Sequence, residues 1–141
     1  MRRIRFLRFV YLFGATFDGL TLIPMLSPAV GGKMLGIADF QPGPDYGYAI
    51  GLAAALMAGW TALLVWGALA PIARRAVLLL TAAPVVAGLF AAGLYAVAAG
   101  LVPLPFMAPI FAFQLFGFTL FVVGYRLAGR PVAANAGAAV Q

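Results

Sequence analysis

The sequence predicts an all-α integral membrane protein, folded as a four-helix up-and-down bundle. Of its 141 residues, 65% are hydrophobic and only 9% are charged, and the mean hydropathy is +1.08. This composition is much more apolar than that of a soluble domain. The chain also contains four apolar segments, each of which reaches the ~20 residues needed to cross the hydrocarbon core of a bilayer.

The four apolar segments define the predicted domain organisation. They cover residues 6–28, 46–70, 76–99 and 106–125. Together they form a transmembrane domain over residues 1–126. Residues 127–141 have few large apolar side chains and predict a flexible cytoplasmic tail. The link between the second and third segments is too short to hold two helices apart, so these segments should form a hairpin.

The first segment also has a second interpretation. A basic start, an apolar run and the small residues of SPA at 27–29 are typical of a secretory signal with its cleavage site. However, the run is longer than a signal core, it contains Asp18, and its removal would leave an odd number of spans. We therefore expect this segment to be the first membrane span.

The basic residues predict the orientation of the chain in the membrane. Eight arginines lie on one side of the four-span arrangement, and Lys33 is the only basic residue on the other; the arginines are Arg2, Arg3, Arg5, Arg8, Arg74, Arg75, Arg126 and Arg130. Because basic loops remain in the cytoplasm, both termini are predicted to be cytoplasmic, in the inner (cell) membrane of a bacterium. The net charge of +6 therefore reflects topology, and no nucleic-acid partner is predicted.

The loop over residues 29–45 should lie on the exterior side. Its centre, KMLGIADF, has short amphipathic character and predicts one or two turns of helix along the membrane interface. The Pro-Gly-Pro of QPGPD then interrupts the chain before the second span.

Small residues recur at intervals of four in the second and third spans. They are Gly47, Gly51, Ala55 and Gly59 in the second span, and Gly88, Ala92, Ala96 and Gly100 in the third. Such stripes allow another helix backbone to approach closely. We expect them to serve helix packing within the bundle. A stripe that remains free would instead serve self-association or docking to a larger membrane complex.

The residue types present exclude most catalytic chemistry. The chain has no histidine and no cysteine, and no glutamate occurs in it. This excludes thiol chemistry, metal sites built on histidine or cysteine, a serine-histidine triad and a histidine-ligated haem. Because Asp39 and Asp45 lie in the exterior loop, Asp18 is the only acid expected inside the membrane. We predict no catalytic residue, no metal and no cofactor, and a non-enzymatic role is favoured.

Asp18 is the centre of the predicted ligand site. A carboxyl group in hydrocarbon is costly unless it is protonated, paired or hydrated. Its presence inside a span is therefore a reason to expect a functional role. Tyr11 and Thr21 share its helical face, whereas the opposite face is bulky and suits lipid, so Asp18 should point into the bundle. Gln114 is expected close to the depth of Asp18, and Tyr95 in the exterior third of the membrane. These five residues form the predicted ligand site.

Several roles for Asp18 remain open at the level of sequence. The favoured one is a polar anchor for an apolar or amphiphilic small molecule, or for a membrane partner. The first alternative is proton-coupled transport or conduction, in which Asp18 takes up and releases a proton. The second is a purely structural subunit of a membrane (respiratory) complex. In each case the carboxyl group could also simply link the first helix to a neighbour through a hydrogen bond.

Three stretches carry a family resemblance: FDGLTLIPMLSP, KMLGI and YGYAIGLAAALMAGW. With the basic start, they resemble the small four-helix bacterial membrane proteins grouped as DoxX-like. The resemblance implies an up-and-down bundle of largely unassigned activity, associated in some members with respiratory or redox complexes, and it carries over no catalytic residues. The chain is also similar in architecture to the sterol-isomerase and sigma-2-like group, whose sites use more than one acidic group, whereas this chain has only Asp18 inside.

Overall fold

A computed structural model describes residues 2–130 of the chain. Within this range the protein is helical and contains no strand. The elements in chain order are α1 (Arg2–Leu26), α2 (Pro28–Leu35), α3 (Pro44–Leu69), α4 (Ala76–Leu80), the π-helical segment η1 (Thr81–Val86), α5 (Ala87–Ala98) and α6 (Leu104–Gly129).

Four helical stretches are long and apolar enough to cross a membrane: α1, α3, the continuous run Ala76–Ala98 and α6. This confirms a multi-pass arrangement of four helices. Helix α6 runs past the predicted end at residue 125 and stops at Gly129, with Arg126 in its last turn, where a positive charge interacts favourably with the helix dipole. The first residues of the predicted tail therefore belong to α6, and residues 131–141 lie outside the described range.

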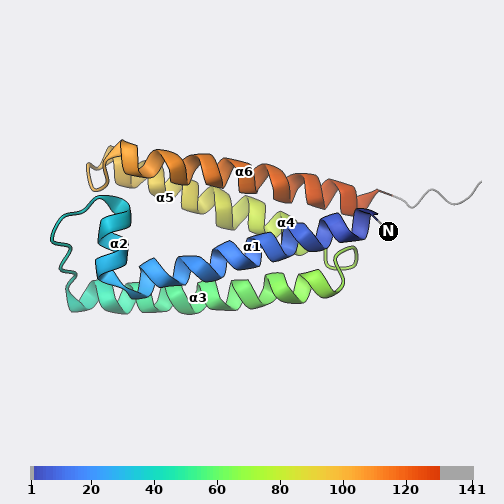
Figure 1. The fold of residues 1–141 in the computed structure, drawn as a ribbon, viewed down its shortest axis with the longest axis horizontal. Helices are drawn as coiled ribbons and strands as arrows, with labels where there is room; N and C mark the ends of the chain where they lie inside the picture. The colour runs from blue at the N-terminus through green and yellow to red at the C-terminus, as the bar shows by residue number, and fades with distance from the viewer. Residues whose placement is uncertain (1, 131–141) are drawn as a thin grey trace, which may run out of the picture.

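The long helices lie side by side along the long axis of the molecule (Figure 1). The start of α1, the turn between α3 and α4, and the end of α6 lie at one end, which we call the arginine end. Helix α2 and the turn between α5 and α6 lie at the other, which we call the α2 end. Towards the α2 end, α1 diverges from α6, and α2 extends across the resulting gap (Figure 1).

The main hydrophobic core is concentrated towards the arginine end. Its largest fully buried side chains are Tyr11, Leu7, Leu64, Leu78 and Val10. The buried residues of α1 all fall within its first fourteen positions, ending at Ala15. Beyond Ala15, α1 continues towards α2 without a fully buried residue.

Glycines allow close helix contacts inside this core. A Cβ atom on Gly14 of α1 would lie 2.7 Å from Cζ of Phe121, and one on Gly124 of α6 would lie 3.2 Å from Cδ1 of Leu78. A Cβ atom on Gly67 of α3 would overlap the ring of Tyr11. Small residues at such points let large side chains of a facing helix approach the backbone.

Polar contacts add to the core at the arginine end. Arg3 donates hydrogen bonds from Nη2 to the carbonyl oxygens of Ala128, at 2.7 Å, and Arg130, at 2.8 Å. It thereby pairs with backbone acceptors left free by the end of α6. The Tyr11 hydroxyl donates to the carbonyl oxygen of Arg74 at 2.8 Å, so α1 is also bonded to the turn between α3 and α4.

Helix α2 differs from the predicted interfacial helix in its bounds. It begins at Pro28, whose fixed φ suits the first turn of a helix. It ends before Gly36, which has a left-handed φ of 68° and donates its N–H to the carbonyl oxygens of Gly32 and Lys33. The prediction of a short helix between the first two spans is therefore confirmed, but only Lys33, Met34 and Leu35 of the KMLGIADF segment belong to it.

Candidate functional site

The site is built around Asp18, which lies on the inward face of α1. This residue follows Gly14 by one helical turn and Tyr11 by two, so it shares the face that α1 turns towards the core. Its side chain is half-buried, its Oδ2 atom is shielded from solvent, and this atom has no hydrogen-bond partner among the described residues. Asp18 therefore lies just beyond the end of the core, where α1 diverges from α6.

Gln114 occupies the equivalent position on α6. It is separated by helical spacings from Met107, Gly117 and Phe121, which are buried on the inward face of this helix. Its Oε1 atom is also shielded and has no hydrogen-bond partner within residues 2–130. These spacings put Gln114 on the inward face of α6.

Aromatic contacts fix the relative level of the two polar side chains. The rings of Phe17 and Phe113, the residues that precede Asp18 and Gln114, lie 4.6 Å apart between centroids. Phe13 of α1 also contacts Phe113, with ring centroids 5.9 Å apart. Asp18 and Gln114 therefore lie at about the same height, on faces of α1 and α6 that are directed towards the bundle interior.

Asp18 Oδ2 and Gln114 Oε1 are two shielded oxygen atoms at about one level, and neither accepts a hydrogen bond from another described residue. An unpartnered polar group away from water costs roughly 1–3 kcal/mol, and more if it is charged. The hydroxyl group of Thr61, on the facing part of α3, donates to the carbonyl oxygen of Met57. The arrangement can therefore bind a donor supplied from outside the chain, such as a hydroxyl, an amine or an ammonium group.

The other predicted ligand residues are not brought together with this pair. Tyr11 is fully buried in the core, with its hydroxyl group bonded to the carbonyl oxygen of Arg74. Thr21 is exposed and donates to the carbonyl oxygen of Phe17 in its own helix. Tyr95 is 71% exposed on α5. Of the predicted set, Asp18 and Gln114 are the two that lie at about the same height and that each have a shielded oxygen atom without a partner among the described residues.

The stripes of small residues remain open. No heavy atom lies within 4 Å of a Cβ atom built on any of four glycines, which are Gly47, Gly51, Gly59 and Gly88. Ala55 and Ala92 are exposed. Packing between α5 and α6 uses Gly93 instead, where a Cβ atom would lie 2.7 Å from Cε1 of Phe111. Sequence spacing alone did not identify this glycine.

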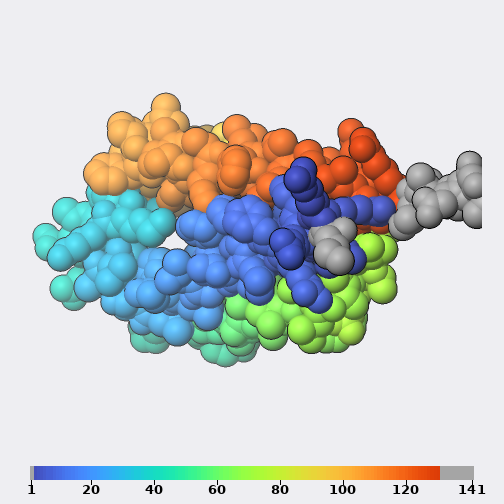
Figure 2. Space-filling model, turned by 45° about the vertical axis from the view of Figure 1, so that its right-hand side comes forward, coloured from blue at the N-terminus to red at the C-terminus, as the bar shows by residue number. Residues whose placement is uncertain are grey.

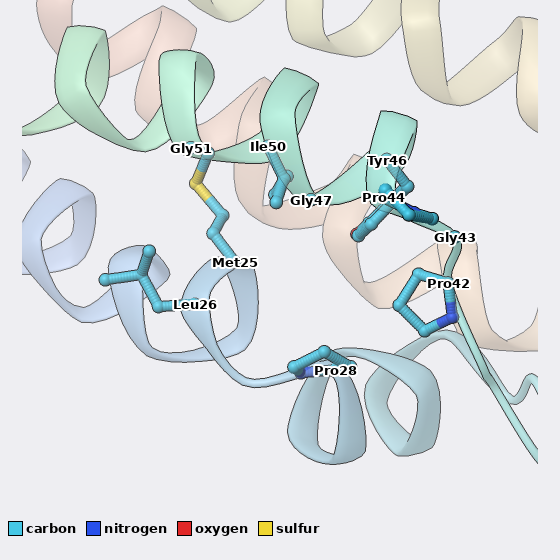
Figure 3. A pocket seen from close by; sticks show the side chains of 10 residues that line it. All are labelled: Met25, Leu26, Pro28, Pro42, Gly43, Pro44, Tyr46, Gly47, Ile50 and Gly51. Carbon is cyan, nitrogen blue, oxygen red and sulfur yellow. The ribbon is translucent and has the colours of Figure 1, made fainter.

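The surface is hollowed near the α2 end. Figure 2 shows an opening between the atoms of α2 and those of α1, beneath the atoms of α6. A separate groove of about 500 Å³ lies between the end of α1 and the starts of α2 and α3, with Met25, Pro28, Tyr46 and Ile50 among its lining residues (Figure 3). Met25 follows Asp18 by seven residues, about 10 Å along the helix.

The site contains no set of metal ligands. Among residues 2–130, no group of three histidine, cysteine, aspartate or glutamate side chains lies close enough together to hold a metal ion. The chemistry available at Asp18 and Gln114 is therefore hydrogen bonding and, for an ionised carboxylate, attraction of a cationic group.

Comparisons with known proteins identify no relative: no family model, curated protein or solved structure matches the chain.

Proposed function

We propose that this protein is a multi-pass membrane protein that binds an amphiphilic small molecule between α1 and α6. The polar head of the molecule would carry a hydrogen-bond donor and bind to Asp18 and Gln114. Its apolar part would occupy the space between α1 and α6 next to α2. The observation that carries the proposal is the pair of shielded, unpartnered acceptor oxygens at one level of the bundle.

Three features of the surroundings support a ligand in this position. The main core lies towards the arginine end, with Asp18 just beyond its last buried position on α1. The part of the bundle where α1 diverges from α6 is apolar, so bulk water does not supply hydrogen bonds to the two oxygens there. A donor group on a ligand would supply them. The opening between α1 and α2 (Figure 2) gives an amphiphile lateral access from the bilayer.

The proposal includes the orientation and the location of the protein. We propose an up-and-down bundle with both termini in the cytoplasm of a bacterium, because all eight arginines fall at the end that holds the N-terminus and the end of α6. A DoxX-like relationship is compatible with four spans and remains part of the proposal.

The test is recovery of small molecules with the purified protein. Wild type, Asp18→Asn, Asp18→Leu and Gln114→Leu would be extracted from native membranes in mild detergent, and the co-purifying molecules identified by mass spectrometry. We expect a molecule with a hydroxyl or amine head group that is enriched in wild type and depleted in all three variants. Thr119→Val is the matched control, because the Thr119 hydroxyl is exposed and bonded within α6 to the carbonyl oxygen of Leu115.

Two outcomes would contradict ligand binding. If Asp18→Asn and Asp18→Leu recover the same molecules as wild type and are equally stable, Asp18 is not an anchor. If the variants lose stability and recover an unchanged set of molecules, the carboxyl group links helices, for example as a protonated donor to Oε1 of Gln114, and the ligand proposal fails.

A further inference from the structure

Six of the eight arginines at the arginine end fall into two groups. Three of them are used by the fold: Arg3 bonds to the last carbonyl groups of α6, Arg74 donates to the carbonyl oxygen of Trp66, and Arg75 lies over the ring of Tyr125. The guanidinium group of Arg74 also stacks on the Trp66 ring at 3.7 Å. These contacts assign a structural role to this group.

A second group of arginines faces outwards from α1. Arg2, Arg5 and Arg8 are exposed and recur at intervals of three, on the side of α1 opposite to its buried residues Leu7 and Val10. No hydrogen bond from their side chains to another described residue is present. They therefore form a face of guanidinium groups on the first two turns of α1.

No carboxylate side chain neutralises this face. The three acids of the sequence are Asp18, Asp39 and Asp45. Asp39 and Asp45 belong to the loop and helix start at the α2 end, and Asp18 lies ten residues beyond Arg8, about 15 Å further along α1. The positive charge of the three arginines is thus left for an external anion.

The surface next to the arginines indicates what kind of anion this is. Phe9 is 55% exposed and Leu12 is 49% exposed, and both follow the arginines on the same outward side of α1. A soluble acidic partner would not cover apolar side chains of a membrane span. A phospholipid would, because its phosphate meets the arginines while its acyl chain covers the apolar surface next to them.

We propose that Arg2, Arg5 and Arg8 bind the headgroups of anionic phospholipids in the leaflet at the arginine end. The guanidinium group suits this role, because its planar set of donors matches phosphate oxygens in two-pronged hydrogen bonds. This surface is distinct from the Asp18 site and does not depend on the function proposed for it.

The experiment measures lipid binding to the full-length protein. Delipidated protein in mild detergent would be titrated with phosphatidylglycerol or phosphatidylcholine, and the bound lipids counted by native mass spectrometry. Since a basic residue near an anionic surface contributes roughly a fivefold gain in affinity, Arg5→Gln should weaken phosphatidylglycerol binding about fivefold, and Arg5→Gln with Arg8→Gln about 25-fold. Binding of phosphatidylcholine should change much less, and added salt should reduce the wild-type preference.

Two further variants make the test specific. Lys33→Gln removes one exposed positive charge at the α2 end, so it controls for a general effect of net charge and should leave phosphatidylglycerol binding unchanged. The double change of Arg5 and Arg8 to lysine keeps the charge and should retain most of the preference. The proposal is overturned if the double glutamine variant binds phosphatidylglycerol like wild type, or if Lys33→Gln weakens it as much as Arg5→Gln.

Discussion

Replacement of Gly14 with alanine should destabilise the core at the arginine end. The added Cβ atom would lie 2.7 Å from Cζ and 2.9 Å from Cε1 of Phe121, and 3.4 Å from Cδ1 of Leu64. These two side chains are only 4% and 0% exposed, so neither can swing into open space. Overpacking of this kind costs roughly 1–3 kcal/mol, while the better helix propensity of alanine returns up to about 1 kcal/mol.

Gly51→Ala is the matched control for this change. Gly51 lies within a long helix, as Gly14 does, but no heavy atom lies within 4 Å of a Cβ atom at this position. Both variants gain the same helix propensity, so the difference between them isolates the packing term. Gly14→Ala should therefore be less stable than Gly51→Ala by about 1–3 kcal/mol in free energy of unfolding.

The measurement is reversible unfolding in mixed micelles of mild detergent and sodium dodecyl sulfate, followed by tryptophan fluorescence and circular dichroism. Coincident transitions of the two signals would justify a two-state free energy. Equal free energies of unfolding for Gly14→Ala and Gly51→Ala would refute the close approach of α1 to Phe121.

Two further predictions concern the core and the open stripes. Tyr11→Phe removes the hydrogen bond to the carbonyl oxygen of Arg74 and should lower the free energy of unfolding by about 1 kcal/mol; an unchanged value in the same assay would mean that this bond contributes nothing. For self-association, Gly51→Leu or Ala92→Leu should weaken crosslinking between copies in native membranes, because both positions are open within the chain. A protein that runs as a monomer in mild detergent and in crosslinking, with neither substitution having an effect, would contradict self-association through the open stripes.

Much of the fold follows from the sequence because hydropathy and charge act along the chain. The need to keep long apolar runs in hydrocarbon is sufficient to predict four helices, and the structure confirms them with shifts of a few residues at their ends. The inward position of Asp18 also follows from local information, since the contrast between small and bulky faces of α1 has the helical period. Gln114 could be placed only by depth.

The packing could not be predicted in this way, because it depends on pairs of residues far apart in the chain. Gly51 and Gly67 have similar sequence surroundings, yet only Gly67 meets a ring, that of Tyr11. In the sequence, a stripe of glycines has the same spacing whether it faces lipid or another helix. The segment η1 is a similar case: Pro84 signals an interrupted helix, but a π-helical path through Thr81–Val86 depends on how the surrounding helices pack.

The concentration of stabilising contacts at one end has a mechanical consequence. The core and the bonds of Arg3 and Tyr11 fasten the helices near the arginine end, whereas α1 runs for eleven residues beyond Ala15, about 16 Å of helix. A bundle fastened in this way acts as a lever, in which a small rotation at the fixed end becomes a larger displacement at the free one. Local opening should therefore require less free energy towards α2 than at the arginine end, so that the half of the molecule that carries Asp18 can widen while the other half stays folded.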